Sequence, residues 1–167
     1  MELKGKAFKF GDDINTDLII SGKYKFKTLD MKELSKHVLE DARLNFYDEL
    51  TPGDFIVGGR NFGCGSSREQ APLAIKFAKV SGVIAKSFAR IFYRNSINVG
   101  LPVIICNESD RIDEGDKISV DLEKGKIINE TKDIVLDASP IPPFMMEILN
   151  DGGMVEYFNK GKGFDNI

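Results

Sequence analysis

Histidine, cysteine and tryptophan are scarce in this sequence, which has one histidine, two cysteines and no tryptophan among 167 residues. The cysteines, Cys64 and Cys106, lie too far apart for a disulfide-rich secreted framework or for a paired metal-ligand motif. We therefore predict that the chain binds no metal of its own and occupies a reducing compartment. The single histidine, His37, lies in a charged helical stretch, and Ser66 is followed by Ser67 and Arg68 in place of the Gly-x-Ser-x-Gly pattern of a nucleophile elbow. Both features argue against a Ser-His-Asp hydrolase.

Long apolar runs and an excess of one charge are also absent. No stretch approaches the roughly twenty apolar residues that a bilayer-spanning helix needs, and the first residues lack the core of a signal peptide. The net charge is -3, and acidic and basic residues are interspersed, so no basic stripe of the kind that binds nucleic acid is present. We predict a cytoplasmic protein with neither a membrane nor a nucleic-acid partner.

The pattern of apolar residues predicts an α/β fold in one domain over residues 1–167, with 161–167 as a flexible tail. Strands are predicted at 6–10, 54–57, 83–85 and 103–106, and helices at 30–40, 67–80 and 87–98. The later segments 117–122, 126–128 and 134–136 read as short strands, followed by one helix from 143 to the glycines at 152 and 153. The β-α-β-α-β run from 54 to 106 suits a parallel sheet, whose ligands bind at the carboxyl ends of the strands.

Residues 59–71 contain more candidate ligand-binding groups than any other stretch of the chain. Gly63 and Gly65 can adopt backbone angles that other residues avoid, and the guanidinium of Arg68 matches a carboxylate or a phosphate. Free amides at the start of the following helix would attract the same anion. A plainer reading is a capping box, with Ser66 as N-cap and Glu69 three residues later. A helix cap requires neither the glycines nor Arg68, and their presence favours an anion-holding turn.

Two familiar glycine-rich loops do not match this turn. A dinucleotide fingerprint needs a third glycine where Arg68 stands, together with an acidic residue about twenty positions further on. A P-loop needs Gly-Lys followed by Ser or Thr, and this triplet does not occur in the chain.

Four motifs, in the same order along the chain, resemble those of the aconitase superfamily's swivelling domain. The resemblance is closest to the separate small subunits of isopropylmalate isomerases and homoaconitases. The motifs are Gly11-Asp12-Asp13-Ile14-Asn15-Thr16-Asp17, Asn61-Phe62-Gly63-Cys64-Gly65-Ser66-Ser67-Arg68-Glu69, Tyr93-Arg94-Asn95-Ser96-Ile97-Asn98-Val99-Gly100-Leu101-Pro102, and residues 143–153. This family implies a single β/β/α domain of the aconitase C-terminal type, with a mostly parallel core sheet, flanking helices and extra short strands.

The resemblance also implies a reaction. Its members dehydrate and rehydrate a hydroxy di- or tricarboxylic acid, so that a hydroxyl moves to the neighbouring carbon. Carried over to this chain, the catalytic residues are Ser66 and Asp17, and the substrate carboxylate is bound by Arg68 with Ser67 and Gly65 beside it. The family uses a 4Fe-4S cluster, which cysteine thiolates normally hold. Because two distant cysteines cannot supply that set, we expect the cluster on a separate large subunit.

Substrate choice is expected from the loop that contains Tyr24, Lys25, Phe26 and Lys27. Homoaconitase-like small subunits resemble Tyr-Leu-Arg-Thr here, and Phe26 takes the place of the arginine. An apolar ring favours a branched alkyl group and leaves a third carboxylate unpaired. We therefore predict isopropylmalate, in leucine biosynthesis, or the methyl-substituted citramalate as substrate. Homocitrate is the alternative if Lys25 or Lys27 reaches the extra carboxylate. A different class also stays open, namely a non-catalytic, anion-binding regulatory module.

Overall fold

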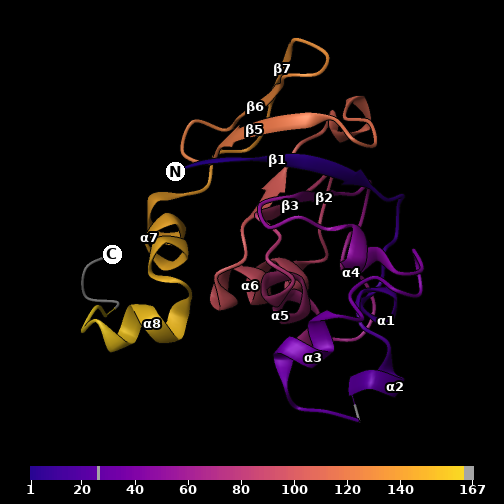
Figure 1. The fold of residues 1–167 in the computed structure, drawn as a ribbon. Coiled ribbons are helices and arrows are strands. Elements are labelled where there is room, and N and C mark those ends of the chain that lie inside the picture. Colours follow the sequence, from indigo (N-terminus) through magenta and orange to yellow (C-terminus); the bar gives the residue numbers. More distant parts are fainter. Residues whose placement is uncertain (26, 164–167) are drawn as a thin grey trace.

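A single seven-stranded sheet forms the centre of the computed structural model, which describes residues 1–25 and 27–163 (Figure 1). The strand order is β4-β3-β2-β1-β5-β6-β7. The strands are β1 (Glu2–Lys9), β2 (Phe55–Val57), β3 (Gly82–Ala85), β4 (Val103–Ile105), β5 (Lys117–Asp121), β6 (Lys126–Asn129) and β7 (Ile134–Asp137). Each lies within a few residues of a predicted strand, which confirms the mixed α/β fold.

The sheet has a parallel half and an antiparallel half. Strand β1 pairs in parallel with β2 and antiparallel with β5, so it joins the two halves. The run from β2 to β4 is parallel, as predicted, and β5 to β7 extend the same sheet as an antiparallel meander. In the parallel half, Ile56 and Ile84 are fully buried. On β6 and β7 buried and exposed residues alternate, as expected for a sheet with one face in water.

Helices cover the parallel half of the sheet. They are α1 (Thr16–Ile19), α2 (Gly22–Lys25), α3 (Met31–Ser35), α4 (Phe46–Glu49), α5 (Gln70–Phe77), α6 (Arg90–Val99), α7 (Pro143–Asp151) and α8 (Met154–Asn159), with one 3-10 turn at Ser109–Arg111. Helices α5 and α6 cross between the parallel strands and lie together beneath β2 and β3 (Figure 1). No helix within the described ranges is long and apolar enough to cross a membrane.

The helix predicted at 30–40 is shorter than expected. Helix α3 ends at Ser35, and turns follow as far as Ala42. Leu39 has a φ of 53°, and its amide donates to the carbonyl oxygen of Ile19 at 2.8 Å. A right-handed helix cannot continue through a left-handed residue, so this buried tertiary contact replaces the last helical turn.

The prediction of one C-terminal helix was wrong, because α8 follows α7. Helix α7 does end at Gly152, whose φ of 96° lies in the left-handed region. Asp151 then accepts hydrogen bonds from Lys160 at 2.6 Å and Lys162 at 2.8 Å, which hold the end of α8 against the end of α7. Of the tail predicted at 161–167, residues 164–167 lie outside the described residues.

Candidate active site

Three loops meet where β1, β2 and β3 end. Because these strands are parallel, the loops that follow them leave from one edge of the sheet. The amide of Gly59 donates to the Gly11 carbonyl oxygen at 3.1 Å, and the amide of Lys86 donates to the Gly59 carbonyl oxygen at 2.9 Å. The glycine-rich turn therefore lies at the carboxyl ends of the strands, as predicted.

The glycines of the turn are needed for space as well as for backbone angle. Gly63 and Gly65 have φ values of 82° and 92°, in the region that side chains disfavour. A Cβ on Gly63 would lie 2.1 Å from Cγ of Phe92, so no side chain fits between the turn and α6. This contact sets the distance between the two elements that form the site.

The predicted capping box is wrong. Helix α5 begins at Gln70, its N-cap residue is Glu69, and no side chain caps it. Ser66 and Ser67 instead lie in the irregular turn before the helix, where both are exposed. Neither hydroxyl has a hydrogen-bond partner among residues 1–25 and 27–163. The two serines are thus free to contact a ligand.

The first motif holds the glycine turn in place through Thr16, which is 3% exposed. The Thr16 amide donates to the Cys64 carbonyl oxygen, and its hydroxyl donates to the main-chain oxygen of Ser66, both at 2.9 Å. The amide of Gly63 also donates to the Ile14 carbonyl oxygen at 2.7 Å. Sequence reasoning missed Thr16, although its place inside the first motif was the available signal.

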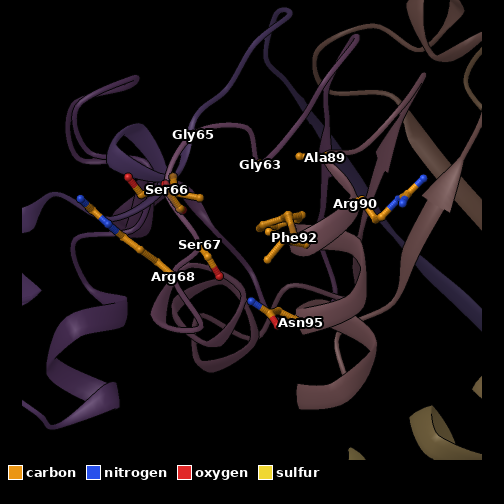
Figure 2. Close-up of a pocket in the computed structure, with 11 residues that line it drawn as sticks. Gly63, Gly65, Ser66, Ser67, Arg68, Ala89, Arg90, Phe92 and Asn95 are labelled. Carbon is orange, nitrogen blue, oxygen red and sulfur yellow. The ribbon is translucent and has the colours of Figure 1, made fainter.

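Asp17 and Arg68, which the sequence placed in one site, form an ion pair. The Arg68 guanidinium also donates to the carbonyl oxygen of Ile20 at 3.4 Å, and its side chain is 18% exposed. Asn15 caps α1 by accepting from the Leu18 amide at 2.9 Å, so this part of the motif does bond its own backbone. In Figure 2 the Arg68 side chain runs from the turn away from Phe92 and Asn95.

A cleft of about 210 Å³ separates the turn from the start of α6 (Figure 2). It is lined by Thr16, Gly63, Gly65, Ser66, Ser67, Arg68, Ala89, Arg90, Ile91, Phe92 and Asn95. The N-cap residue of α6 is Ala89, which has no side chain that could accept from the first-turn amides. Those amides carry the positive end of the helix dipole and attract an anion. The sequence predicted an anion site at the start of α5, whose N-cap residue Glu69 also makes no side-chain cap, so both helix starts present uncapped amides.

Asn95 is a second residue that sequence reasoning undervalued. Its side chain ends opposite the Ser67 hydroxyl across the cleft (Figure 2). It has no hydrogen-bond partner in the part of the chain that the structure describes. The third motif contains Asn95 and Asn98, and only the fold shows that Asn95 is the one at this cleft.

The proposed specificity loop lies apart from the cleft in its described portion. The Tyr24 ring stacks on His37, with centroids 3.7 Å apart and planes at 6°. Nδ1 of His37 lies 2.9 Å from the Glu40 carboxylate. Burial tends to raise the pKa of Glu40, but hydrogen bonds with His37 and Tyr24 lower it overall. Neither Tyr24 nor Lys27 lines the cleft. Phe26 and the side chain of Lys25 lie outside the described residues.

An iron–sulfur cluster does not fit the cysteines of this chain. Cys64 is half-buried in the glycine turn, while Cys106 is buried after β4, where burial raises the pKa of its thiol. Clusters are held by thiolates, which a raised pKa disfavours. Among the described residues, no three His, Cys, Asp or Glu side chains gather as a metal site.

Comparison with known proteins places these features in a family. The family model described as the aconitase C-terminal domain matches residues 9–108. A 3-isopropylmalate dehydratase small subunit 2 of Archaeoglobus fulgidus is 58% identical over 160 residues, covering 96% of each chain. A small subunit of the same name from Thermodesulfovibrio yellowstonii is 51% identical and covers 100% of this chain and 99% of its own. The crystal structure of a 3-isopropylmalate dehydratase from Methanocaldococcus jannaschii superposes with a TM-score of 0.92, at 49% identity and 96% and 95% coverage.

Proposed function

Because this chain belongs to the aconitase C-terminal domain family, among the small subunits of 3-isopropylmalate dehydratases, we propose that its cleft is one part of an active site that a large subunit completes. The enzyme is a hydro-lyase of leucine biosynthesis. In the proposed reaction 2-isopropylmalate loses water and regains it with the hydroxyl on the neighbouring carbon. Citramalate, which differs in its alkyl group, is a second proposed substrate.

The polar groups around the cleft that have no intramolecular partner are the main support for this proposal. The hydroxyls of Ser66 and Ser67 lie on one wall, and the uncapped amides that open α6 lie on the other. Together they suit a ligand that has both a carboxylate and a hydroxyl. A volume of about 210 Å³ is below the roughly 300–1,000 Å³ of a complete ligand pocket. The difference is consistent with a partner that provides a further wall.

We assign the proton transfer to Ser66. In dehydration, the serine oxygen takes the proton from the carbon next to the one that bears the hydroxyl. The C–H electrons form the double bond, and the hydroxyl leaves as water with a proton from an acid that the large subunit would supply. In rehydration a hydroxyl adds to the carbon that lost its proton, and the serine returns that proton to the carbon that lost the hydroxyl. A helix dipole contributes only about 0.3–1 kcal/mol, or up to about 2, against about 1.4 kcal/mol per pKa unit. The deprotonated serine therefore needs additional hydrogen-bond donors, from the glycine turn and from the partner.

Arg68 is the proposed carboxylate ligand, and Asp17 acts through it. A guanidinium has five N–H donors in a planar fork, so it can bind a substrate carboxylate and keep one contact with Asp17. Asp17 is 65% exposed at its side chain, which leaves it free to follow Arg68 toward the cleft. We accordingly propose Asp17 as a positioning residue, in place of the direct catalytic role expected from sequence.

The cluster belongs, in this proposal, to the large subunit, because the described cysteines do not fit it. The name of the relatives, small subunit, implies such a partner. When bound there, the cluster would supply a Lewis acid for the departing hydroxyl. The present chain would supply the base, the carboxylate site and part of the wall that excludes water.

Turnover in the assembled enzyme tests this division. The chain is mixed anaerobically with a cluster-bearing large subunit, and the unsaturated intermediate is followed by its ultraviolet absorbance. We expect no turnover by either subunit alone. Ser66→Ala should lower kcat by about 10²- to 10⁴-fold, the usual contribution of a general base, with little change in assembly. Ser67→Ala is the matched control and should lose much less. Equal losses for both serines, or turnover without the partner, would reject the assignment.

Substrate preference is tested at Phe26, which lies outside the described residues but replaces the arginine of homoaconitase-like loops. Phe26→Arg should raise kcat/KM for homocitrate relative to isopropylmalate by about tenfold or more, because a guanidinium can pair with the third carboxylate. Phe26→Leu keeps the position apolar and should leave the ratio unchanged. If the arginine variant also leaves the ratio unchanged, this loop does not select the substrate.

A further inference from the structure

A second hollow lies beside the cleft, between α6 and the C-terminal helices α7 and α8. Its volume is about 270 Å³. It is lined by Arg90, Tyr93, Arg94, Ile97, Asn98, Phe144, Met145, Ile148 and Met154. We call this set the α6–α7 groove. Arg90 also lines the cleft of Ser66, so the two hollows adjoin.

The floor of the groove is apolar and partly open to solvent. Met145 and Met154 are half-buried, and the Tyr93 hydroxyl donates to the Met145 sulfur at 3.9 Å. Burial raises the pKa of Tyr93, so its hydroxyl stays neutral at physiological pH. Methionine is a flexible side chain that adapts to a partner's shape, and it is enriched in the core of protein interfaces.

The rim of the groove is positively charged, and no acidic side chain on the groove lining neutralises it. Arg90 and Arg94 lie one turn apart on the same side of α6, and both are exposed. Neither guanidinium has a hydrogen bond or an ion pair within the described residues. No Asp or Glu lines the groove, although the chain as a whole carries a charge of -3. By contrast, Arg43 and Arg68 are each paired with a carboxylate.

We propose that the α6–α7 groove docks an acidic segment of the large subunit, with apolar side chains on its floor and carboxylates on Arg90 and Arg94. Two observations select this occupant. The two unpaired arginines favour an anionic partner, because opposite charges steer and align an association. The groove also continues from the cleft, so a subunit that closes over Ser66 passes directly over Arg90. This inference rests on the proposed function, since it needs that partner.

The test uses residues that line the groove but not the cleft. Arg94→Glu reverses a rim charge, and Met145→Gln makes the floor polar. Each should raise the Kd for the cluster-bearing large subunit by about tenfold, measured by calorimetry. Lys117→Glu makes the same change of charge on β5 and should alter Kd by less than about twofold. Thermal melts of the isolated variants show whether each one is folded.

Two further measurements distinguish a loss of docking from a loss of catalysis. In about 0.5 M salt the defect of Arg94→Glu should shrink, because charges are screened, while that of Met145→Gln persists. With the large subunit in saturating excess, both variants should regain the wild-type kcat within about twofold.

Unchanged Kd values for both variants would overturn the docking site while leaving the proposed function intact, provided that the wild-type subunits still assemble and turn over. Failure of the wild-type pair to assemble would reject the proposed function itself. A dimer of the isolated chain that Arg94→Glu abolishes in sedimentation would make a second copy the occupant, and would also overturn the proposal.

Discussion

The guanidinium of Arg68 lies between the Asp17 carboxylate and the main-chain carbonyl of Ile20, and both contacts are made through Nη1. Nη2 and Nε take part in neither contact, so their N–H groups can bind a substrate carboxylate without displacing Asp17 or Ile20. The two contacts at Nη1 hold the guanidinium in place beside the glycine turn.

Thr16 gives a prediction at the scale of a single residue. Its buried hydroxyl holds the main-chain oxygen of Ser66, so Thr16→Val should let the serine shift while the packing volume stays the same. We expect kcat of the assembled enzyme to fall by about ten- to a hundredfold with little change in KM, since small misplacements of a catalytic group are costly. Steady-state kinetics on isopropylmalate measure both constants.

The conservative variant separates positioning from folding. Thr16→Ser keeps the hydroxyl and should restore most of kcat, although it removes a methyl group. If Thr16→Val retains the wild-type kcat, or if Thr16→Ser is equally impaired, the hydrogen bond to Ser66 does not position the base.

At the scale of elements, the corner between α7 and α8 depends on Asp151, whose side chain is 7% exposed. Hydrogen bonds from Lys160 and Lys162 lower the pKa of Asp151. A lowered folded-state pKa means that the stabilisation is present above the unfolded value of about 3.9 and is lost as pH falls through the folded value. We expect the Tm to hold between about pH 7 and 5 and to drop below about pH 4.

Asp151→Asn should have a lower Tm than wild type at neutral pH and a smaller further loss in acid, as measured by calorimetry from about pH 7 to 3. Glu130→Gln removes one exposed carboxylate that has no ion pair in the part of the chain that the structure describes, and it should follow the wild-type profile. Parallel curves for wild type and Asp151→Asn would show that this carboxylate contributes nothing to acid unfolding.

Sequence patterns located the strands well and the short helices poorly. Buried runs such as residues 54–57 stand out because each strand of a parallel sheet is apolar on both faces. Helices α1, α2 and α4 have four residues each, which is too short for a helical period to appear. The capping box was wrongly predicted because Ser66 and Glu69 match that pattern locally, whereas the N-cap residue of α5 is Glu69. Tertiary bonds from Thr16 hold that turn in another shape.

The types of residue in the candidate site could be predicted from the sequence, but the directions in which their side chains point could not. The pairing of Asp17 with Arg68 agreed with their joint placement from motifs. The cleft-facing position of Asn95, and the packing of Gly63 on Phe92, depend on how α6 crosses back beneath the sheet. Periodicity along one segment does not encode such a distance between elements.

For the whole molecule, β1 is the strand on which both halves of the sheet depend. Gly5 on β1 lies so close to the loop before β2 that an added Cβ would be 2.1 Å from the Gly53 carbonyl oxygen. Gly5→Ala should therefore destabilise the protein by about 1–3 kcal/mol, the usual cost of overpacking. Denaturant unfolding measures the change. Gly11→Ala adds a methyl with nothing within 4 Å and should change stability far less. Similar losses for the two variants would contradict this account.

The cleft between the glycine turn and α6 also bears on how the enzyme responds to concentration. If the remaining catalytic groups belong to another polypeptide, a complete site exists only while two chains are associated. Once dilution brings both subunits below their dissociation constant, halving each one reduces the number of complete sites about fourfold, as mass action requires. Catalytic capacity then follows the product of the two subunit levels, so a change in either subunit alters the flux in proportion.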